Sequence, residues 1–250
     1  MAAFADEFDG TGLDLSVWFP HYLPAWSSRE ATRASYRIED SCLVLDLPPG
    51  TGHWCPEDHY PPLRISGIQS GNFSGPVGST QGQQPFLDGQ TVKEAQERFE
   101  GHLTTGDHLE IRCRMTLSPR SMAAFWLVGF EDRPERCGEI CVTEVFGRAV
   151  DPGRTAEVGM GVHAFRDPYP PEDFAAPRID LDVAQLQTYA VDWDADEARF
   201  SVNGLEVRRC ARPPTYPMQL MLAVFDFPTW GSAEDEDFVP ELVVDRVTGS

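Results

Sequence analysis

The sequence has 250 residues, of which 41% are hydrophobic and 11% aromatic, and its 20 basic and 40 acidic residues give a formal net charge of −20. Such a charge repels nucleic acid and anionic membranes and disfavours highly sulfated partners. No apolar run approaches the roughly 18 residues of a membrane-spanning segment. We therefore expect one globular domain over residues 1–250, a monomer that contacts neither nucleic acid nor membrane.

The N-terminus and the cysteines bear on the cellular compartment. Strand-like sequence begins at Phe4 and Phe8, with no basic and apolar leader before it. The six cysteines are scattered, and the one close pair, Cys137 and Cys141, has no second pair or nearby histidine to complete a zinc site. Reduced thiols favour the cytoplasm. A secreted protein whose leader has been removed is the alternative.

The first hundred residues combine one strand pair with long loops. Residues 35–47 alternate between apolar and polar and stop at Pro48-Pro49-Gly50, which predicts two strands and a turn. Residues 50–106 are rich in glycine and proline, with a helical-looking patch over 92–99. Loops this long inside a compact domain are usually functional. We expect them to wall a cleft that Trp54 faces, with ordinary loop packing of Trp54 as the alternative.

The most regular alternation in the chain covers residues 109–117. Apolar residues there alternate with Glu110, Arg112, Arg114 and Thr116, which predicts a strand with one buried and one wet face. If the charged face lines the cleft, Arg112 or Arg114 holds an acidic side chain in place there. Simple solvation of Arg112 is the alternative. Because sequential antiparallel strands usually pair, we expect this strand to lie beside the next two.

Two glutamates lie five residues apart in a later segment that we expect to form a strand. An apolar run over residues 123–129 contains Trp126, and Glu139 and Glu144 follow in a segment that otherwise looks like a buried strand. Side chains five apart in a regular strand point to opposite faces, unless one extra residue bulges out between them. A bulge would place both carboxyls on one face. Such a pair, about 5 to 5.5 Å apart, performs retaining glycoside hydrolysis.

Further strands are expected in the second half of the chain. The segment 159–165 contains His163, and an Asn203-Gly204 hairpin turn joins strands in the segment 199–207. The acidic run 234–237 is interpreted as a solvated loop. The remaining predicted strands cover residues 189–193, 219–227 and 241–247.

These segments, in this order, resemble glycoside hydrolase family 16, the laminarinase-like and lichenase-like enzymes. The segment 139–144 is similar to the family signature Glu-x-Asp-x-x-Glu in its bulged form, and 124–129 is similar to the run Ala-Phe-Trp-Leu-x-Gly that precedes it. The resemblance extends nearly from end to end. It also includes the opening segment 4–10, the segments 189–193 and 200–204, and the closing segment 243–247.

The resemblance implies an all-β fold, a concanavalin A-like β-sandwich jelly roll of two stacked antiparallel sheets with a concave substrate cleft. We expect about 12 to 15 short strands. It also implies a glycosidase acting by a retaining mechanism on a β-glucan, most simply one with β-1,3 linkages, with no cofactor required. Glu139 would be the nucleophile and Glu144 the general acid and base. Substrate contacts would come from Trp126, His163, Met122, Phe146 and Trp54.

The sequence departs from the family pattern at the middle acid, which is Cys141 here. A thiol does not supply the charge of a carboxylate. We therefore expect weak activity that increases on Cys141→Asp. A non-catalytic or weakly active carbohydrate-binding protein on the same fold is the alternative, and a purely structural protein is a third. The family also implies a structural calcium ion, for which Asp245 is the one candidate side-chain ligand.

Overall fold

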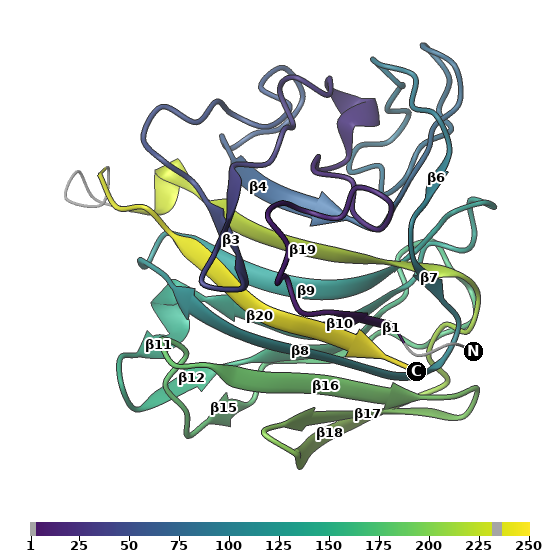
Figure 1. Ribbon diagram of the computed structural model, residues 1–250. Helices are drawn as coiled ribbons and strands as arrows, with labels where there is room; N and C mark the ends of the chain where they lie inside the picture. The colour runs from purple at the N-terminus through teal and green to yellow at the C-terminus, as the bar shows by residue number, and fades with distance from the viewer. Residues whose placement is uncertain (1–3, 232–236) are drawn as a thin grey trace.

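Two antiparallel β-sheets, stacked face to face, form the body of the molecule (Figure 1). The computed structural model describes residues 4–231 and 237–250. The expectation of an all-β jelly-roll sandwich is confirmed. Within the described residues no helix has both the length and the apolar character that crossing a membrane requires. The acidic run 234–237 lies largely outside the described residues.

The eight-stranded sheet contains the two ends of the described chain. Its strands run β18-β17-β16-β8-β20-β3-β2, and β1 pairs with β20 at its side. Figure 1 shows β20, β8 and β16 side by side across the front of the molecule. The strands are β1 (Phe4–Asp6), β2 (Tyr36–Glu39), β3 (Cys42–Asp46), β8 (Asp107–Thr116), β16 (Gln187–Trp193), β17 (Glu197–Val202), β18 (Leu205–Ala211) and β20 (Glu241–Gly249).

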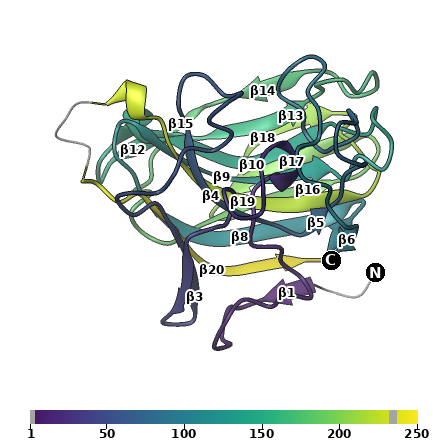
Figure 2. The same ribbon diagram turned by 90° about the horizontal axis from the view of Figure 1, so that it is seen from above.

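The seven-stranded sheet holds the two glutamates. Its strands run β14-β13-β10-β9-β19-β4, and β7 also pairs with β19. Figure 2 shows this sheet, with β10, β9 and β19, above β8 and β20 in the picture. The strands are β4 (Arg64–Gln69), β7 (Leu103–Thr104), β9 (Ser121–Gly129), β10 (Glu139–Phe146), β13 (Gly159–His163), β14 (Asp173–Ala175) and β19 (Met218–Asp226).

Short elements complete the structure. In the part of the chain that the structure describes, two small sheets and three single turns of 3₁₀ helix lie in the connections. They are β5 (Gly71–Asn72), β6 (Phe99–Glu100), β11 (Val150–Asp151), β12 (Thr155–Glu157), β15 (Arg178–Ile179), η1 (Pro24–Trp26), η2 (Gly147–Ala149) and η3 (Pro228–Trp230).

The main core lies between the two sheets, and alternation along each strand builds it. In β8 the residues Leu109, Ile111, Cys113 and Met115 are buried in that core, whereas the residues between them are partly exposed. Every residue of β9 is buried instead. Its alternate side chains contribute to a second apolar cluster on the other face of the seven-stranded sheet, where loops cover it. A strand covered on both faces loses the alternating pattern, which is why residues 121–129 form a continuous apolar run.

Three fold predictions are wrong in detail. Residues 92–99 form no helix, because the chain there runs irregularly into β6. The described residues contain 20 strands rather than 12 to 15, since many connections form two- or three-residue ladders. The strand β8 does not lie beside β9 and β10; it pairs with β16 and β20 in the opposite sheet. The chain therefore crosses from one sheet to the other between β8 and β9.

One glycine on the strand next to β10 allows two backbones to approach closely. Gly161 has φ +145°, and a Cβ atom there would lie 2.2 Å from the carbonyl oxygen of Asp173. We expect Gly161→Ala to destabilise the fold by about 2 kcal/mol or more, lowering Tm by roughly 4 to 8 °C. Thermal unfolding measures this. Gly52→Ala is the control, because a Cβ at Gly52 meets nothing within 4 Å, and equal Tm values for the two variants would contradict the prediction.

Candidate active site

A β-bulge in β10 places both glutamates on the same face of the sheet, as predicted. Against β9, Cys141 pairs with Trp126 and Thr143 with Phe125, so Val142 has no partner there. The side chain of Val142 packs in the core between the sheets. Glu139 faces the cavity on the other side of the sheet, and the extra residue returns Glu144 to that face.

The glutamate face forms the floor of a cavity of about 480 Å³. Its walls come largely from loops of the first hundred residues, as the long-loop interpretation predicts. Trp54 and Phe86 lie there with ring centroids 4.9 Å apart. The aromatic surface is typical of sites that stack on the C–H face of sugar rings. The lining residues are Tyr22, Leu23, Trp54, His59, Leu63, Ile65, Gln84, Pro85, Phe86, Trp126, Val128, Glu139, Phe165, Met221 and Phe225.

Both catalytic candidates are carboxyls in a dry environment. Glu139 is 9% exposed, and burial raises its pKa well above the usual value, with further increases from the charges of Glu144 and Glu172. Burial also raises the pKa of Glu144, whereas His163 and Trp126 lower it. Because the two carboxyls repel each other's charge, ionising one of them favours the protonated form of the other. Burial therefore favours the protonated form of both carboxyls.

Cys141 lies between the glutamates on the same face but is fully enclosed. Its side chain is 0% exposed, and its Sγ donates to the carbonyl oxygen of Gly159 at 3.5 Å. Burial raises the pKa of the Cys141 thiol well above its usual range, and the charges of Glu144 and Glu139 raise it further. The thiol therefore stays neutral and adds no negative charge between the two glutamates.

Trp126 lies across the floor of the cavity, opposite Cys141 on the neighbouring strand. Its ring meets Phe225 edge-on, with centroids 5.6 Å apart. The indole N–H of Trp126 lowers the pKa of Glu144 and of Cys141. This N–H is buried and makes no hydrogen bond of good geometry to the described residues, so its influence on the two side chains comes from proximity.

His163 is paired with Glu139 across the β10–β13 ladder. Its Nδ1 lies 2.6 Å from Glu172 Oε1, and its ring stacks on Phe174 at 4.5 Å. The hydrogen bond to a carboxylate fixes the orientation of the imidazole. The proximity of His163 lowers the pKa of Glu144. His163 is thus a neighbour of the acid pair, and its predicted role as a substrate contact stays a prediction.

Met122 and Phe146 lie at the Glu144 end of the same face, outside the lining of the main cavity. They are paired across the β9–β10 ladder. Phe146 lies 6.2 Å from Phe227 and 5.9 Å from Trp230, measured between ring centroids. The face of the acid pair therefore continues into a second aromatic group beyond Glu144.

The placement of Arg112 in the cleft is wrong. Arg112 belongs to β8 in the eight-stranded sheet, and its Nη1 donates to Asp245 Oδ2 at 2.7 Å. A second guanidinium, that of Arg246, lies 3.5 Å from the same oxygen. The carboxylate of Asp245 is thus neutralised by two arginines. No three His, Cys, Asp or Glu side chains gather as a metal site anywhere in residues 4–231 and 237–250, and the calcium ion stays a prediction.

Several residues of the site were not predicted from the sequence. Tyr22 lies edge-on to Trp54 at 5.7 Å and to Phe225 at 5.6 Å. Burial and the charges of Glu139 and Glu144 raise the pKa of Tyr22, which places its phenol close to the acid pair. Phe225 continues the aromatic floor from β19. The alternation along β19 would have shown which residues share a face, but no sequence signal shows that Tyr22 folds over that face.

Comparison with solved structures gives the class of fold. No family model matches the chain, and no curated protein matches it. A GlcNAcα1-4Gal-releasing endo-β-galactosidase from Clostridium perfringens is similar with a TM-score of 0.80 and 24% identity over 98% of this chain. The chain spans 61% of the length of that protein.

Two other similar structures match over most of their own length. The catalytic domain of an endo-1,3-β-glucanase (laminarinase) from Thermotoga petrophila has a TM-score of 0.66 and 16% identity, covering 98% of this chain and 95% of that one. A non-specific endo-β-1,3(4)-glucanase from family GH16 has a TM-score of 0.63 and 16% identity, covering 98% and 88%. The chain has the laminarinase-like jelly-roll fold that these glycoside hydrolases share.

The buried charge of Glu139 predicts that the site destabilises the fold. Because the pKa of Glu139 is higher in the folded than in the unfolded chain, ionisation at neutral pH costs stability, and this cost disappears below the unfolded pKa near 4. We expect Glu139→Gln to raise the free energy of unfolding at pH 8 by about 1 to 3 kcal/mol, with a difference that shrinks towards pH 4.

Thermal unfolding of both proteins between pH 4 and 8 measures this difference. The control is Glu135→Gln, at an exposed position, for which we expect no change in Tm across the range. A Tm of Glu139→Gln below that of the parent protein at pH 8, or a gain that is the same at every pH, would contradict the prediction.

Proposed function

We propose that the protein is a glycoside hydrolase that cleaves a β-linked glycan within the chain, with retention of configuration. The observation that carries the proposal is the bulge at Val142, which turns Glu139 and Glu144 to one face of the sheet, with Glu139 in the floor of an aromatic cavity. Two carboxyls flanking one bond are what retaining hydrolysis needs. The fold shared with laminarinases and an endo-β-galactosidase supports the same reaction class.

The proposed reaction has two steps. A carboxylate oxygen of Glu139 forms a bond to the anomeric carbon, while the bond from that carbon to the leaving oxygen breaks and Glu144 gives this oxygen its proton. Glu144 then takes a proton from water, and the water oxygen displaces Glu139 from the sugar. Glu139 leaves as a carboxylate and Glu144 is protonated again. No metal or redox group takes part in either step.

The mechanism requires the proton to be on a particular carboxyl before the first step. The role assignment requires ionised Glu139 and protonated Glu144, whereas burial raises the pKa of both carboxyls in the free protein. We propose that the bound substrate determines which of the two carboxyls carries the proton. Positive charge developing at the anomeric carbon favours the carboxylate beside it, and a leaving oxygen at Glu144 favours the acid.

Substrate identity is the finer part of the proposal. The bulged signature of residues 139–144 resembles laminarinases, which favours a β-1,3-glucan. The TM-score of 0.80 to an endo-β-galactosidase against 0.66 to a laminarinase makes a β-galactan the second candidate. The net charge of −20 favours a neutral glycan in both cases, because an anionic chain would be repelled.

Retention of configuration tests the proposed roles. The protein is incubated with laminarin, lichenan, agarose, xyloglucan and a β-galactan, and reducing ends and anomeric configuration are followed. We expect retained configuration, and kcat at least about 100-fold lower in Glu139→Gln and in Glu144→Gln, because each loses an essential carboxyl. Glu135→Gln is the matched control. Inverted product, or turnover that survives both changes, would refute the roles.

A separate outcome would favour the non-catalytic alternative. The neutral Cys141 thiol supports this alternative, because it adds no third negative charge that would adjust the pKa values of Glu139 and Glu144. Glycan oligosaccharides that bind without product release, with a Kd unchanged by Glu139→Gln, would identify a carbohydrate-binding protein on the same fold. The absence of binding to any glycan on an array would identify a structural one.

Cys141 itself gives a further prediction. In Cys141→Asp we expect a higher kcat and a pH optimum shifted upwards, because a third carboxyl in the same dry pocket raises the pKa of both glutamates. Cys141→Ser keeps a neutral donor and is the control, with an unshifted optimum. If the pH dependence of kcat is the same in Cys141→Asp and Cys141→Ser, the prediction is wrong.

A further inference from the structure

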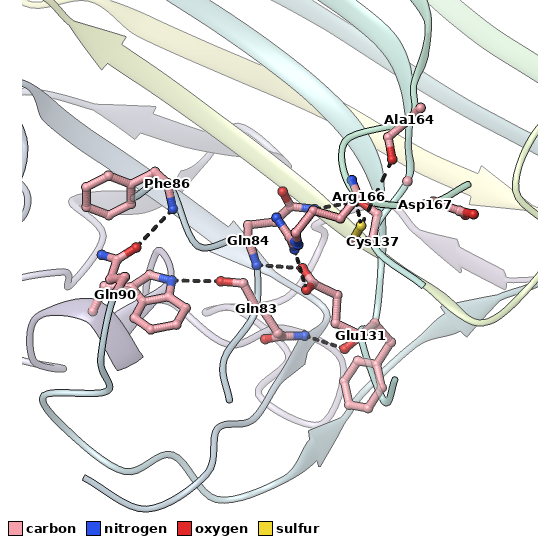
Figure 3. Close-up of polar contacts among 12 residues, drawn as sticks. Gln83, Gln84, Phe86, Gln90, Glu131, Cys137, Ala164, Arg166 and Asp167 are labelled. Carbon is pink, nitrogen blue, oxygen red and sulfur yellow. Dashed lines mark hydrogen bonds and ion pairs between the residues drawn. The ribbon is translucent and has the colours of Figure 1, made fainter. Parts of the chain in front are cut away.

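A buried carboxylate outside the cavity connects two of its walls. Glu131 is 6% exposed and follows β9 by two residues. Its Oε1 accepts the backbone N–H of Gln84 at 2.5 Å, and its Oε2 accepts Nη2 of Arg166 at 2.8 Å. Figure 3 shows the backbone of Gln84 and the side chain of Arg166 reaching Glu131 from two different loops.

The two loops are the lips of the cavity. One lip, residues 83–86, places Gln84, Pro85 and Phe86 in the lining, and the other, residues 164–167, places Phe165 there. Each oxygen of Glu131 therefore holds the backbone or the side chain of one lip, next to an aromatic ring. The ring of Phe165 is 53% exposed, and a large apolar side chain exposed beside an acid pair is available to a ligand.

Cys137 makes a second connection between the same lips. Its carbonyl oxygen accepts Nε2 of Gln84 at 3.0 Å, and its Sγ accepts the backbone N–H of Arg166 at 3.3 Å. Both contacts are drawn in Figure 3. Cys137 is one residue from Gly138 and two from Glu139, so the lips are anchored to the segment that carries the proposed nucleophile.

The backbone in this network is strained. Gln84, Glu131 and Phe165 all have positive φ, at 47°, 57° and 49°. For residues other than glycine this left-handed region is unfavourable. Such strain persists only where surrounding contacts hold it, and it clusters at ligand clamps. Three such residues in one network indicate that the positions of the lips are maintained against the local preference of the chain.

We propose that Glu131 is a positioning residue: it fixes both lips of the cavity, so that Phe86 and Phe165 present their rings to the sugar units on the Glu139 side. This rests on the proposed function for the identity of the ligand. The carboxylate does not touch the reacting atoms. Its contribution is to reduce the cost of ordering the lips when the glycan binds, and such preorganisation acts on affinity.

The link that Glu131 makes between the two lips, here called the tether, depends on pH. Burial raises the pKa of Glu131 to about 7, opposed by the hydrogen bond from Gln84 and the charge of Arg166. Arg166 is the charged group that bonds to it, and the neighbouring Cys137 thiol stays neutral because burial raises its pKa. Asp167 accepts the hydroxyl of Tyr216. As pH falls through about 7, Glu131 becomes neutral and the ion pair with Arg166 is lost.

Glu131→Gln imitates the neutral form and is the main test. Hydrogen exchange at pH 7.5 should be faster in peptides covering residues 83–86 and 164–167 than in the parent protein. The KM for the cleaved glycan should rise about threefold to tenfold with kcat within about twofold. Below pH 7 the parent KM should approach that of Glu131→Gln. The matched control, Glu135→Gln in the same loop, should change neither exchange nor KM.

Two further variants separate positioning from general damage. Arg166→Gln leaves Glu131 bonded to Gln84 and should release the lip 164–167 alone, which keeps the test available if Glu131→Gln does not fold. In Phe165→Ala the KM should rise by a similar factor, and adding Glu131→Gln should then have less effect than in the parent protein. Additive effects of the two changes would overturn the proposal.

The exchange result also separates this proposal from the proposed function. If the parent protein cleaves no glycan, faster exchange in both lips of Glu131→Gln still supports the tether while the hydrolase assignment fails. Unchanged exchange in both lips, or a loss of kcat with KM unchanged, overturns the positioning role even if hydrolysis is demonstrated.

Discussion

The constraint on which the site depends is one unpaired residue in β10. Strand side chains alternate, so Glu139 and Glu144 would face opposite sides of the sheet without the bulge. Val142 takes the extra position and is held by the core between the sheets. Apolar packing on one face therefore fixes the chemistry on the other. The same sheet must be buried on both faces, and loops of the first hundred residues cover the second face and become the cavity walls.

The raised pKa values in the site follow from the loops that cover this face of the sheet. Glu139, Cys141 and Glu144 share a dry face, and burial raises the pKa of all three. Mutual repulsion between the glutamates disfavours ionisation of both, which is the condition that the proposed pairing of an acid with a nucleophile requires. Stability is lost in the process, since an ionised Glu139 is poorly solvated. The lips add strained backbone held by Glu131. Site geometry is maintained here at the expense of stability.

Two of the sequence predictions illustrate where pattern alone fails. The alternation over residues 109–117 correctly predicted β8. However, β8 belongs to the eight-stranded sheet and not to the sheet that carries the glutamates, and Arg112 on its charged face pairs with Asp245. Pairing partners depend on where the chain crosses between sheets, and local periodicity carries no information on crossing. The segment 92–99 had helical periodicity, yet Val92 is buried under the cavity wall in irregular chain. Tertiary burial outweighed a weak local preference there.

The sequence by itself determined the all-β class, most strand positions and the acid strand with its bulge, because period-two alternation and an odd spacing of two glutamates are local properties of the chain. It also determined that Cys141 brings no charge, since this is a property of the residue type. Only the tertiary structure decided that Tyr22, Phe225, Gln84 and Phe165 join the site, and that Glu131 links its lips. Contacts between residues dozens of positions apart depend on sheet order and loop packing, which local patterns do not encode.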